Sequence, residues 1–184
     1  LMTHGSVDVQ GITGEELSGV LRVLREMGAE IVESETGLHL ECRSHNATSF
    51  STAPFPGVAT DAQPLLLAAM TNSQGEGDVT ETIFENRFGH VLEYRKFGAD
   101  IALDGRTARV TGTNDLRGAN VEAGDIRAAA GLVLMGLVSA GESRVFEIHH
   151  LARGYERMVD KLRALGGEIV RVPAFDGQEV VHGC

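Results

Sequence analysis

Three arginines in this sequence lie where helices are expected to begin, an unfavourable place for a positive charge. Arg87 follows "FEN" at the expected start of a helix, Arg127 lies two residues after Asp125, and Arg153 immediately precedes the helical segment "GYERMVDKLRALG". A single such arginine is typical of an exposed side chain that reaches into water. Exposed N–H groups at a helix start disfavour a nearby cation by about 0.3–1 kcal/mol, but a bound anion reverses that balance. Together the three arginines therefore predict a site for a small, multiply charged anion.

The residues beside these arginines are candidates for proton transfer and for shaping the site. Thr60 and Gln63 fit the T-x-x-Q pattern of a capping box, so Asp61 is expected in the first turn of a helix. There it could stabilise the helix, or it could act as a general base toward a substrate hydroxyl, and the sequence leaves both interpretations open. Asp125 is expected to cap its own helix. Phe84 ends a strand of alternating pattern, either in the core or at the lip of a pocket.

The elements that must position these side chains belong to an internal repeat. Three segments each predict an amphipathic helix, a glycine stop and a following strand. Their glycines, Gly28, Gly98 and Gly166, are 70 and 68 positions apart. The three segments are "LRVLREMGAEIV", "LEYRKFGADIAL" and "VDKLRALGGEIV".

A second pair of segments completes the repeat unit. "PLLLAAMTNSQGEGDVTETIF" and "AAAGLVLMGLVSAGESRVFEI" each predict an apolar helix, a glycine turn and a strand, with Val79 and Val145 in matching places. The unit is strand, buried helix, strand, amphipathic helix, strand, strand. We expect one α/β domain with units at about 1–48, 49–118 and 119–172, the first incomplete because "LMTHGSVDVQGI" matches only part of a unit, and a tail at 173–184 without an account. A period this long favours three units around a pseudo-threefold axis over an open solenoid.

Composition and short motifs exclude several classes of function. The chain has 184 residues and a net charge of −10, which argues against binding to nucleic acid. The longest apolar run is too short to span a bilayer, and no signal peptide opens the sequence, so we expect a cytoplasmic protein without membrane contact. Cys42 and Cys184 fit no zinc or redox motif, and the pair His149 and His150 lacks the spacing of metal ligands. We therefore expect neither a metal nor a cofactor.

Three stretches carry a resemblance to a known family. "TETIFENRFGHV", "RGYERMVDKLRALGGEI" and "PFPGVATDAQ" make the chain similar to the enolpyruvyl transferases from about residue 5 to residue 172, and above all to the branch that acts on UDP-N-acetylglucosamine. The resemblance implies a domain of three βαβαββ units of the inside-out α/β barrel type. It also implies transfer of the enolpyruvyl group of phosphoenolpyruvate to the 3-hydroxyl of UDP-N-acetylglucosamine, with release of phosphate, in the first committed step of peptidoglycan synthesis.

The same resemblance assigns roles to the candidate residues. Asp61 is implied to be the base that handles the proton of the sugar hydroxyl, and Arg127 and Arg153 to hold phosphoenolpyruvate. Arg87 and Asp125 are implied to position the substrates or other charged groups. Phe84 is implied to border the nucleotide-sugar site. The sequence departs from the family pattern at Ala59, Ala62, Gly89 and Ala152, which affects the shape of the pocket but leaves the charged set intact.

The resemblance covers one domain of a two-domain enzyme. The loop with the family's catalytic cysteine belongs to the other domain, and neither Cys42 nor Cys184 replaces it by motif. We therefore expect no transferase activity from this chain without its second domain. Two alternatives stay open: a transferase with a specificity like that of EPSP synthase, and a non-catalytic anion-binding or assembly module of the same fold. In the latter, an apolar edge left by the incomplete unit would allow homo-oligomers.

Overall fold

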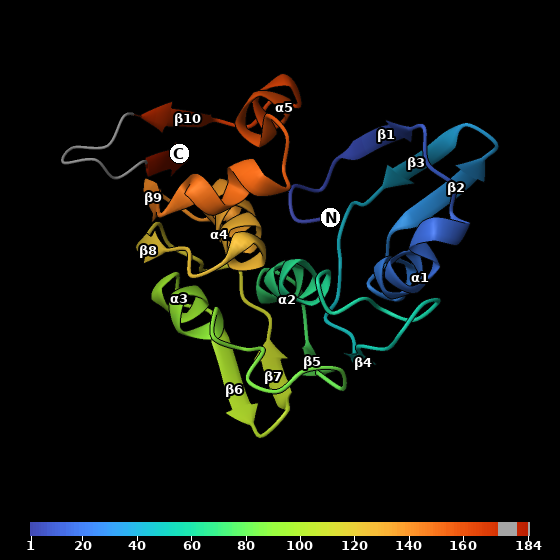
Figure 1. Ribbon diagram of the computed structural model, residues 1–184, viewed down its shortest axis with the longest axis horizontal. Helices are drawn as coiled ribbons and strands as arrows, with labels where there is room; N and C mark the ends of the chain where they lie inside the picture. Colours follow the sequence, from blue (N-terminus) through green and yellow to red (C-terminus); the bar gives the residue numbers. More distant parts are fainter. Residues whose placement is uncertain (173–179, 184) are drawn as a thin grey trace.

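The computed structural model describes residues 1–172 and 180–183, which form three small sheets around a helical centre (Figure 1). The second unit contains every element that the repeat predicts. Its strands are hydrogen-bonded in the order β4-β5-β7-β6, with β4 parallel to β5 and the other pairs antiparallel. The elements are β4 (Phe50–Ser51), α2 (Gln63–Thr71), β5 (Glu76–Thr80), α3 (Val91–Lys96), β6 (Asp100–Asp104) and β7 (Thr107–Thr111).

The third unit repeats this order and adds a short 3₁₀ helix. Its sheet runs β10-β11-β9-β8, with β8 parallel to β9. Strand β11 lies beyond residue 172, where we expected the unit to end, and it pairs with both β9 and β10. The elements are β8 (Asn120–Glu122), α4 (Ile126–Val138), β9 (Ser143–Phe146), η2 (Ile148–Arg153), α5 (Met158–Ala164), β10 (Ile169–Val172) and β11 (Val180–Gly183).

The first unit has a sheet of three strands in the order β1-β3-β2. Among the described residues it has no counterpart of β4 or of α2, which agrees with the incomplete unit expected from the repeat. The free edge of β1 corresponds to the edge on which β5 and β9 accept a parallel strand. The elements are β1 (Ser6–Gln10), the 3₁₀ helix η1 (Glu15–Leu17), α1 (Ser18–Glu26), β2 (Glu30–Ser34) and β3 (Gly37–Glu41).

Helices α2 and α4 lie side by side at the centre and form the core (Figure 1). Both are apolar around their whole circumference, a pattern typical of buried helices, and Leu67 and Leu132 are fully buried. Tyr94 of α3 reaches between them and donates a hydrogen bond to the Pro64 carbonyl at 2.9 Å. Gly131 of α4 leaves room for this ring, because a Cβ there would lie 1.8 Å from the Tyr94 hydroxyl.

Each amphipathic helix ends at the glycine that the repeat predicted. Gly28, Gly98 and Gly166 have φ angles of 110°, 88° and 93°, in the region that only glycine adopts readily. The three helices therefore end by the same backbone device, and each leads directly into the next strand. The same repeat places the N-terminal ends of α2 and α4 at equivalent positions in their units.

An apolar groove runs beside α2 and α4, with a volume of about 600 Å³. All three units contribute to its walls, through the start of the chain and through α1, α2, α4 and α5. The side chains include Leu1, Val20, Leu24, Leu65, Leu134, Leu137 and Leu162. The groove lies beside the core, because Leu24, Leu65, Leu137 and Leu162 in its walls also pack against the buried core residues.

Candidate functional site

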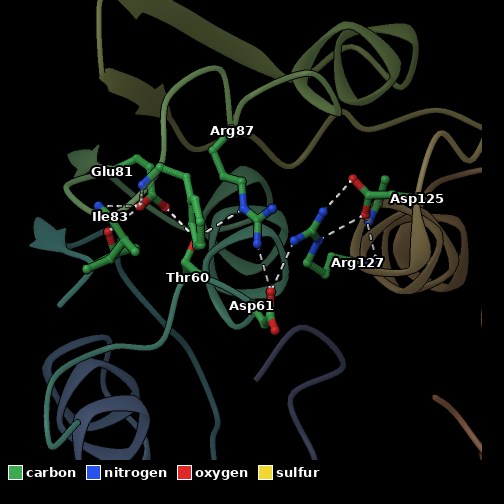
Figure 2. A network of polar contacts seen from close by, with 10 residues as sticks. Thr60, Asp61, Glu81, Ile83, Arg87, Asp125 and Arg127 are labelled. Atoms are coloured by element: carbon green, nitrogen blue, oxygen red, sulfur yellow. Dashed lines mark hydrogen bonds and ion pairs between the residues drawn. The ribbon is translucent and has the colours of Figure 1, made fainter. Parts of the chain in front are cut away.

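The starts of α2 and α4 meet the loop that follows β5, and their charged side chains form one cluster (Figure 2). Asp61 Oδ1 accepts hydrogen bonds from Arg87 Nη2 at 2.9 Å and from Arg127 Nη1 at 3.1 Å. The Asp61 side chain is 73% exposed, whereas those of Arg87 and Arg127 are 20% and 21% exposed. The structure thus gathers two of the three predicted arginines around an accessible carboxylate.

Asp125 caps α4, as the sequence predicted. Its carboxylate accepts hydrogen bonds from the backbone N–H groups of Arg127 at 2.8 Å and Ala128 at 3.0 Å, and from both Nε and Nη2 of the Arg127 guanidinium at 3.1 Å. Burial alone raises the pKa of Asp125, but the hydrogen bonds from Arg127 and Ala128 outweigh it and lower that pKa to about 2. Asp125 is therefore ionised at neutral pH and orients the Arg127 fork.

The capping box predicted for α2 is wrong. The residue at the N-cap position is Ala62, which makes no side-chain cap, and the Thr60 hydroxyl donates instead to Glu81 Oε2 at 2.8 Å. Gln63, expected to complete the box, is fully buried and neither of its amide atoms has a described partner. Asp61 consequently lies outside the helix rather than in its first turn, and its described hydrogen bonds go to Arg87 and Arg127.

Arg87 does not lie in a helical turn either, so that expectation is also wrong. It occupies a turn at 87–90, and α3 begins only at Val91. Its Nε donates to Thr60 Oγ1 at 3.2 Å, and its guanidinium carbon lies 4.7 Å from the centre of the Phe84 ring. The Phe84 residue is 49% exposed, so of the two predicted placements the lip is the correct one.

Arg153 is not joined to the cluster by any described contact. It is the last residue of η2, is exposed, and makes no hydrogen bond or ion pair with the part of the chain that the structure describes. Helix α5 begins at Met158, so Arg153 does not immediately precede a helix as expected. Tyr155, two residues later, lines a pocket of about 430 Å³ together with Asp61, but Arg153 is not among the residues that line it.

Two further residues at the site had no signal in the sequence. His90 is buried at the N-cap of α3, where burial, opposed by the Asp125 charge and aided by Arg127 and Arg87, lowers its pKa to about 4. Burial raises the pKa of Tyr155, and the Asp61 charge adds to that effect. A local pattern does not reveal either residue, because their environment is assembled from units far apart in the sequence.

Candidate metal ligands do not cluster among the residues that the structure describes. These residues contain no group of three or more histidine, cysteine or acidic side chains that could hold an ion. Cys42 is buried and its thiol donates to the Ser44 carbonyl, while Cys184 lies outside the described residues. The ring centres of His149 and His150 lie 4.1 Å apart in η2.

No described helix combines the length and the apolar character needed to cross a membrane.

Solved structures of two enzymes resemble the fold of this chain. The structure resembles that of the enolpyruvyl transferase NikO from Streptomyces tendae with a TM-score of 0.79 and 26% identity, over 97% of this chain and 40% of that one. It also matches EPSP synthase from Acinetobacter baumannii with a TM-score of 0.69 over 96% of this chain and 41% of that one. At 18% identity, the second likeness shows a shared fold.

Sequence relatives narrow this likeness further. The chain is 47% identical over 173 residues to the UDP-N-acetylglucosamine 1-carboxyvinyltransferase of Afipia carboxidovorans. It is 42% identical over 171 residues to the UDP-N-acetylglucosamine 1-carboxyvinyltransferase 1 of Caldanaerobacter subterraneus subsp. tengcongensis. These matches cover 93% and 92% of this chain but only 40% and 41% of the relatives, so the chain spans about two fifths of their length. The family profile described as EPSP synthase (3-phosphoshikimate 1-carboxyvinyltransferase) matches residues 1–162. The chain belongs to this family of enolpyruvyl transferases.

Proposed function

We propose that this chain forms part of an enzyme that transfers the enolpyruvyl group of phosphoenolpyruvate to the 3-hydroxyl of UDP-N-acetylglucosamine. The names of the sequence relatives support this choice of acceptor. The observation that carries the proposal is the exposed Asp61 carboxylate held between the guanidinium groups of Arg87 and Arg127. In this proposal the reaction is the first committed step of peptidoglycan synthesis and takes place in the cytoplasm.

Asp61 is the proposed base. The sugar hydroxyl oxygen forms a bond to C2 of phosphoenolpyruvate, its proton passes to the Asp61 carboxylate, and a proton is added at C3. The tetrahedral intermediate then loses phosphate from C2 and a proton from C3, which restores the double bond. Oδ1 of Asp61 is engaged by the two arginines, whereas no described bond engages Oδ2, so that oxygen is free to meet a hydroxyl.

The arginines are proposed to balance the charge of the donor. Arg127 and Arg153 hold the phosphate and carboxylate groups of phosphoenolpyruvate, since planar guanidinium forks match both groups. Arg127 is already oriented by Asp125, whereas Arg153 has no described partner and is available to a ligand. Preorganised cations of this kind stabilise the charge that develops as phosphate leaves.

The remaining predicted residues shape the site. Arg87 positions Asp61 through the bond to Oδ1, and Asp125 positions Arg127. Phe84 borders the nucleotide-sugar site from the lip, where its ring lies against Arg87. In the same proposal a second domain, outside these 184 residues, supplies the donor of the C3 proton and further cations, and closes over the substrates to exclude water.

The acceptor can be tested directly with the complete protein that contains these residues. Phosphate release from phosphoenolpyruvate is measured with UDP-N-acetylglucosamine and, separately, with 3-phosphoshikimate. The proposal predicts release only with the nucleotide sugar, and none from the 184-residue chain alone. Release only with 3-phosphoshikimate would establish the EPSP-synthase-like alternative, and turnover by the chain alone would refute the need for a second domain.

The apolar groove favours a second candidate role, in assembly. An open apolar flank of about 600 Å³ beside α2 and α4 is suited to contact with another protein surface, including a second copy of this chain. Sedimentation of the 184-residue chain tests this: an assembly role predicts homo-oligomers that Leu137→Glu, in the groove wall, converts to monomers. A chain that is monomeric at all concentrations contradicts the homo-oligomer.

A further inference from the structure

Glu81 is a buried carboxylate just beyond the end of β5, and it contacts three separate segments of the second unit. It is 1% exposed. Oε1 accepts hydrogen bonds from Thr52 Oγ1 at 2.8 Å and from the backbone N–H groups of Ile83 at 2.8 Å and Phe84 at 3.1 Å. Oε2 accepts from Thr60 Oγ1 at 2.8 Å (Figure 2). One side chain thus fixes the segment before α2 relative to the loop that carries Phe84 and Arg87.

The carboxylate also determines the direction of the hydrogen bonds that reach Arg87. An ionised carboxylate has no proton to donate, so the single proton of the Thr60 hydroxyl points to Glu81. The Thr60 oxygen then presents only lone pairs to other groups, and it accepts from Arg87 Nε at 3.2 Å. Arg87 is left with its Nη2 directed at Asp61. The chain of donors and acceptors therefore runs from Arg87 through Thr60 to Glu81.

Glu81 is ionised in this environment. Burial raises its pKa, but the hydrogen bonds from Thr60, from the backbone of Phe84 and Ile83, and from Thr52 outweigh burial and leave the pKa below its usual value. The loop itself is held from its other side, because Arg106 donates to the carbonyl oxygens of Glu81 at 2.8 Å and Phe84 at 3.2 Å. The backbone of the loop does not depend on the Glu81 carboxylate alone.

We infer that Glu81 is a positioning residue for the transfer reaction, which orients Arg87, and through it Asp61, by setting the polarity of the Thr60 hydroxyl. The inference rests on the proposed function for its catalytic consequence, but the hydrogen-bond relay is a property of the folded chain. Glu81 touches no substrate in this account. It acts on the site through Thr60 and Arg87.

Glu81→Gln is the sharpest variant, because glutamine keeps the size and three of the four acceptor contacts. Its Oε1 can still accept from Thr52, Ile83 and Phe84, but its amide nitrogen must donate to Thr60. The Thr60 hydroxyl then accepts from the glutamine and no longer donates to residue 81. Its oxygen is no longer held in the orientation in which it accepts from Arg87 Nε. Because small displacements of catalytic groups reduce rates by up to about 100-fold, we expect kcat/KM of the complete enzyme to fall on the order of 10- to 100-fold. The matched control is Glu76→Gln, an exposed carboxylate at the opposite end of β5.

A double-mutant cycle separates positioning from a general structural role. In an Arg87→Ala background, the account predicts that Glu81→Gln changes kcat/KM by no more than about twofold, because the group that it orients is gone. An undiminished effect of Glu81→Gln in that background would overturn the relay. Thr60→Val, which removes the intermediate hydroxyl but keeps the carboxylate, is expected to reproduce the loss seen with Glu81→Gln.

A readout without turnover keeps this inference distinct from the proposed function. The side-chain Nε–H signal of Arg87, recorded by ¹⁵N NMR and assigned through its loss in Arg87→Ala, reports the bond to Thr60. The account predicts that the signal moves in Glu81→Gln and Thr60→Val but not in Glu76→Gln. An Arg87 signal that is unchanged in folded Glu81→Gln and Thr60→Val refutes the relay. Absent transfer activity together with a shifted Arg87 signal refutes only the proposed function.

Discussion

The starts of α2 and α4 occupy equivalent places in the repeat, yet their aspartates do different things. Asp125 lies at the N-cap of α4, accepts two backbone N–H groups, and binds Arg127 through both carboxylate oxygens. Asp61 lies one residue before the N-cap of α2 and its side chain is 73% exposed. Among the described residues, no backbone N–H group donates to its carboxylate. One carboxylate is part of the scaffold, and the other is presented to the solvent between two guanidinium groups.

The difference is caused by where the neighbouring polar groups find partners. At α2 the Thr60 hydroxyl is drawn away from the helix to Glu81, and no side chain caps the helix. The first turn of α2 therefore has no side-chain cap, and Asp61 stays free for chemistry. Sites that violate local preferences are frequently functional, since the rest of the structure compensates for them. The repeat thus supplies two similar helix starts, and tertiary contacts assign them separate roles.

The largest effect is expected from Asp61→Asn in the complete enzyme. Loss of the base should lower kcat by about 10²–10⁴-fold, since general-base catalysis contributes that much. Because Asp61 caps no helix, the free energy of unfolding should change by less than about 0.5 kcal/mol. Steady-state kinetics and chemical denaturation measure the two quantities, with the exposed Asp100→Asn as the control. An active Asp61→Asn enzyme would show that Asp61 is not the base.

Arg127→Ala tests whether the oriented arginine holds the anion. A hydrogen bond to a charged group is worth about 1.5–3 kcal/mol, so we expect KM for phosphoenolpyruvate to rise by about 10- to 100-fold. Arg153→Ala should raise KM in the same sense but leave the stability of the chain unchanged, because Arg153 has no partner among the described residues. Unaltered KM in Arg153→Ala would remove that residue from the donor site.

His90 lies close enough to the start of α4 and to Arg87 for Asp125, Arg127 and Arg87 to affect its pKa. Because its pKa is about 4 in the folded chain and about 6.5 when unfolded, the unfolded chain binds more protons between these values. The free energy of unfolding should therefore fall as the pH is lowered from about 6.5 to 4, by up to about 3 kcal/mol from this residue. Urea denaturation across that range should show that the free energy of unfolding depends less steeply on pH in His90→Phe than in the wild type. An identical slope in His90→Phe contradicts the buried neutral imidazole.

Asp125→Ala and Asp61→Ala form the smallest but most closely matched pair. Removal of the α4 cap should lower the free energy of unfolding by about 1–2 kcal/mol at pH 7, whereas Asp61→Ala should leave it nearly unchanged. The contribution of Asp125 is present above its unfolded pKa and is lost as the pH falls through about 2. Equal destabilisation by the two variants would abolish the distinction between cap and free carboxylate.

Sequence reasoning predicted the parts of this site that depend on local pattern. Short stretches of neighbouring residues determine the apolar helices α2 and α4, the glycine stops and the Asp125 cap. All of these predictions are confirmed. The predicted gathering of charges is confirmed for Arg87 and Arg127 but not for Arg153, which makes no described contact with them. The enolpyruvyl transferase family, inferred from three stretches, is confirmed as well.

The errors share a physical origin in contacts between distant segments. Thr60 and Gln63 have the spacing of a capping box, but Glu81, 21 residues away, competes for the Thr60 proton. Arg87 was expected in a helix because "ENR" precedes an amphipathic pattern, yet its bonds to Thr60 and Asp61 hold it in a turn. The burial of Glu81 and His90 likewise depends on the assembled fold, which no local pattern encodes.

The affinity of the 184-residue chain for inorganic phosphate, compared between the wild type and Asp61→Asn, tests the central claim most directly. In the free chain Asp61 forms ion pairs with the guanidinium groups of both Arg87 and Arg127. An incoming anion must therefore displace the Asp61 carboxylate. Removal of its charge should therefore tighten phosphate binding, by about three- to tenfold at low ionic strength. Titrations followed through the Arg87 and Arg127 side-chain NMR signals measure both affinities. Tighter binding of phosphate to Asp61→Asn agrees with an anion site in which the Asp61 carboxylate competes with the ligand for the two arginines. Equal, weaker or absent binding of phosphate contradicts this account.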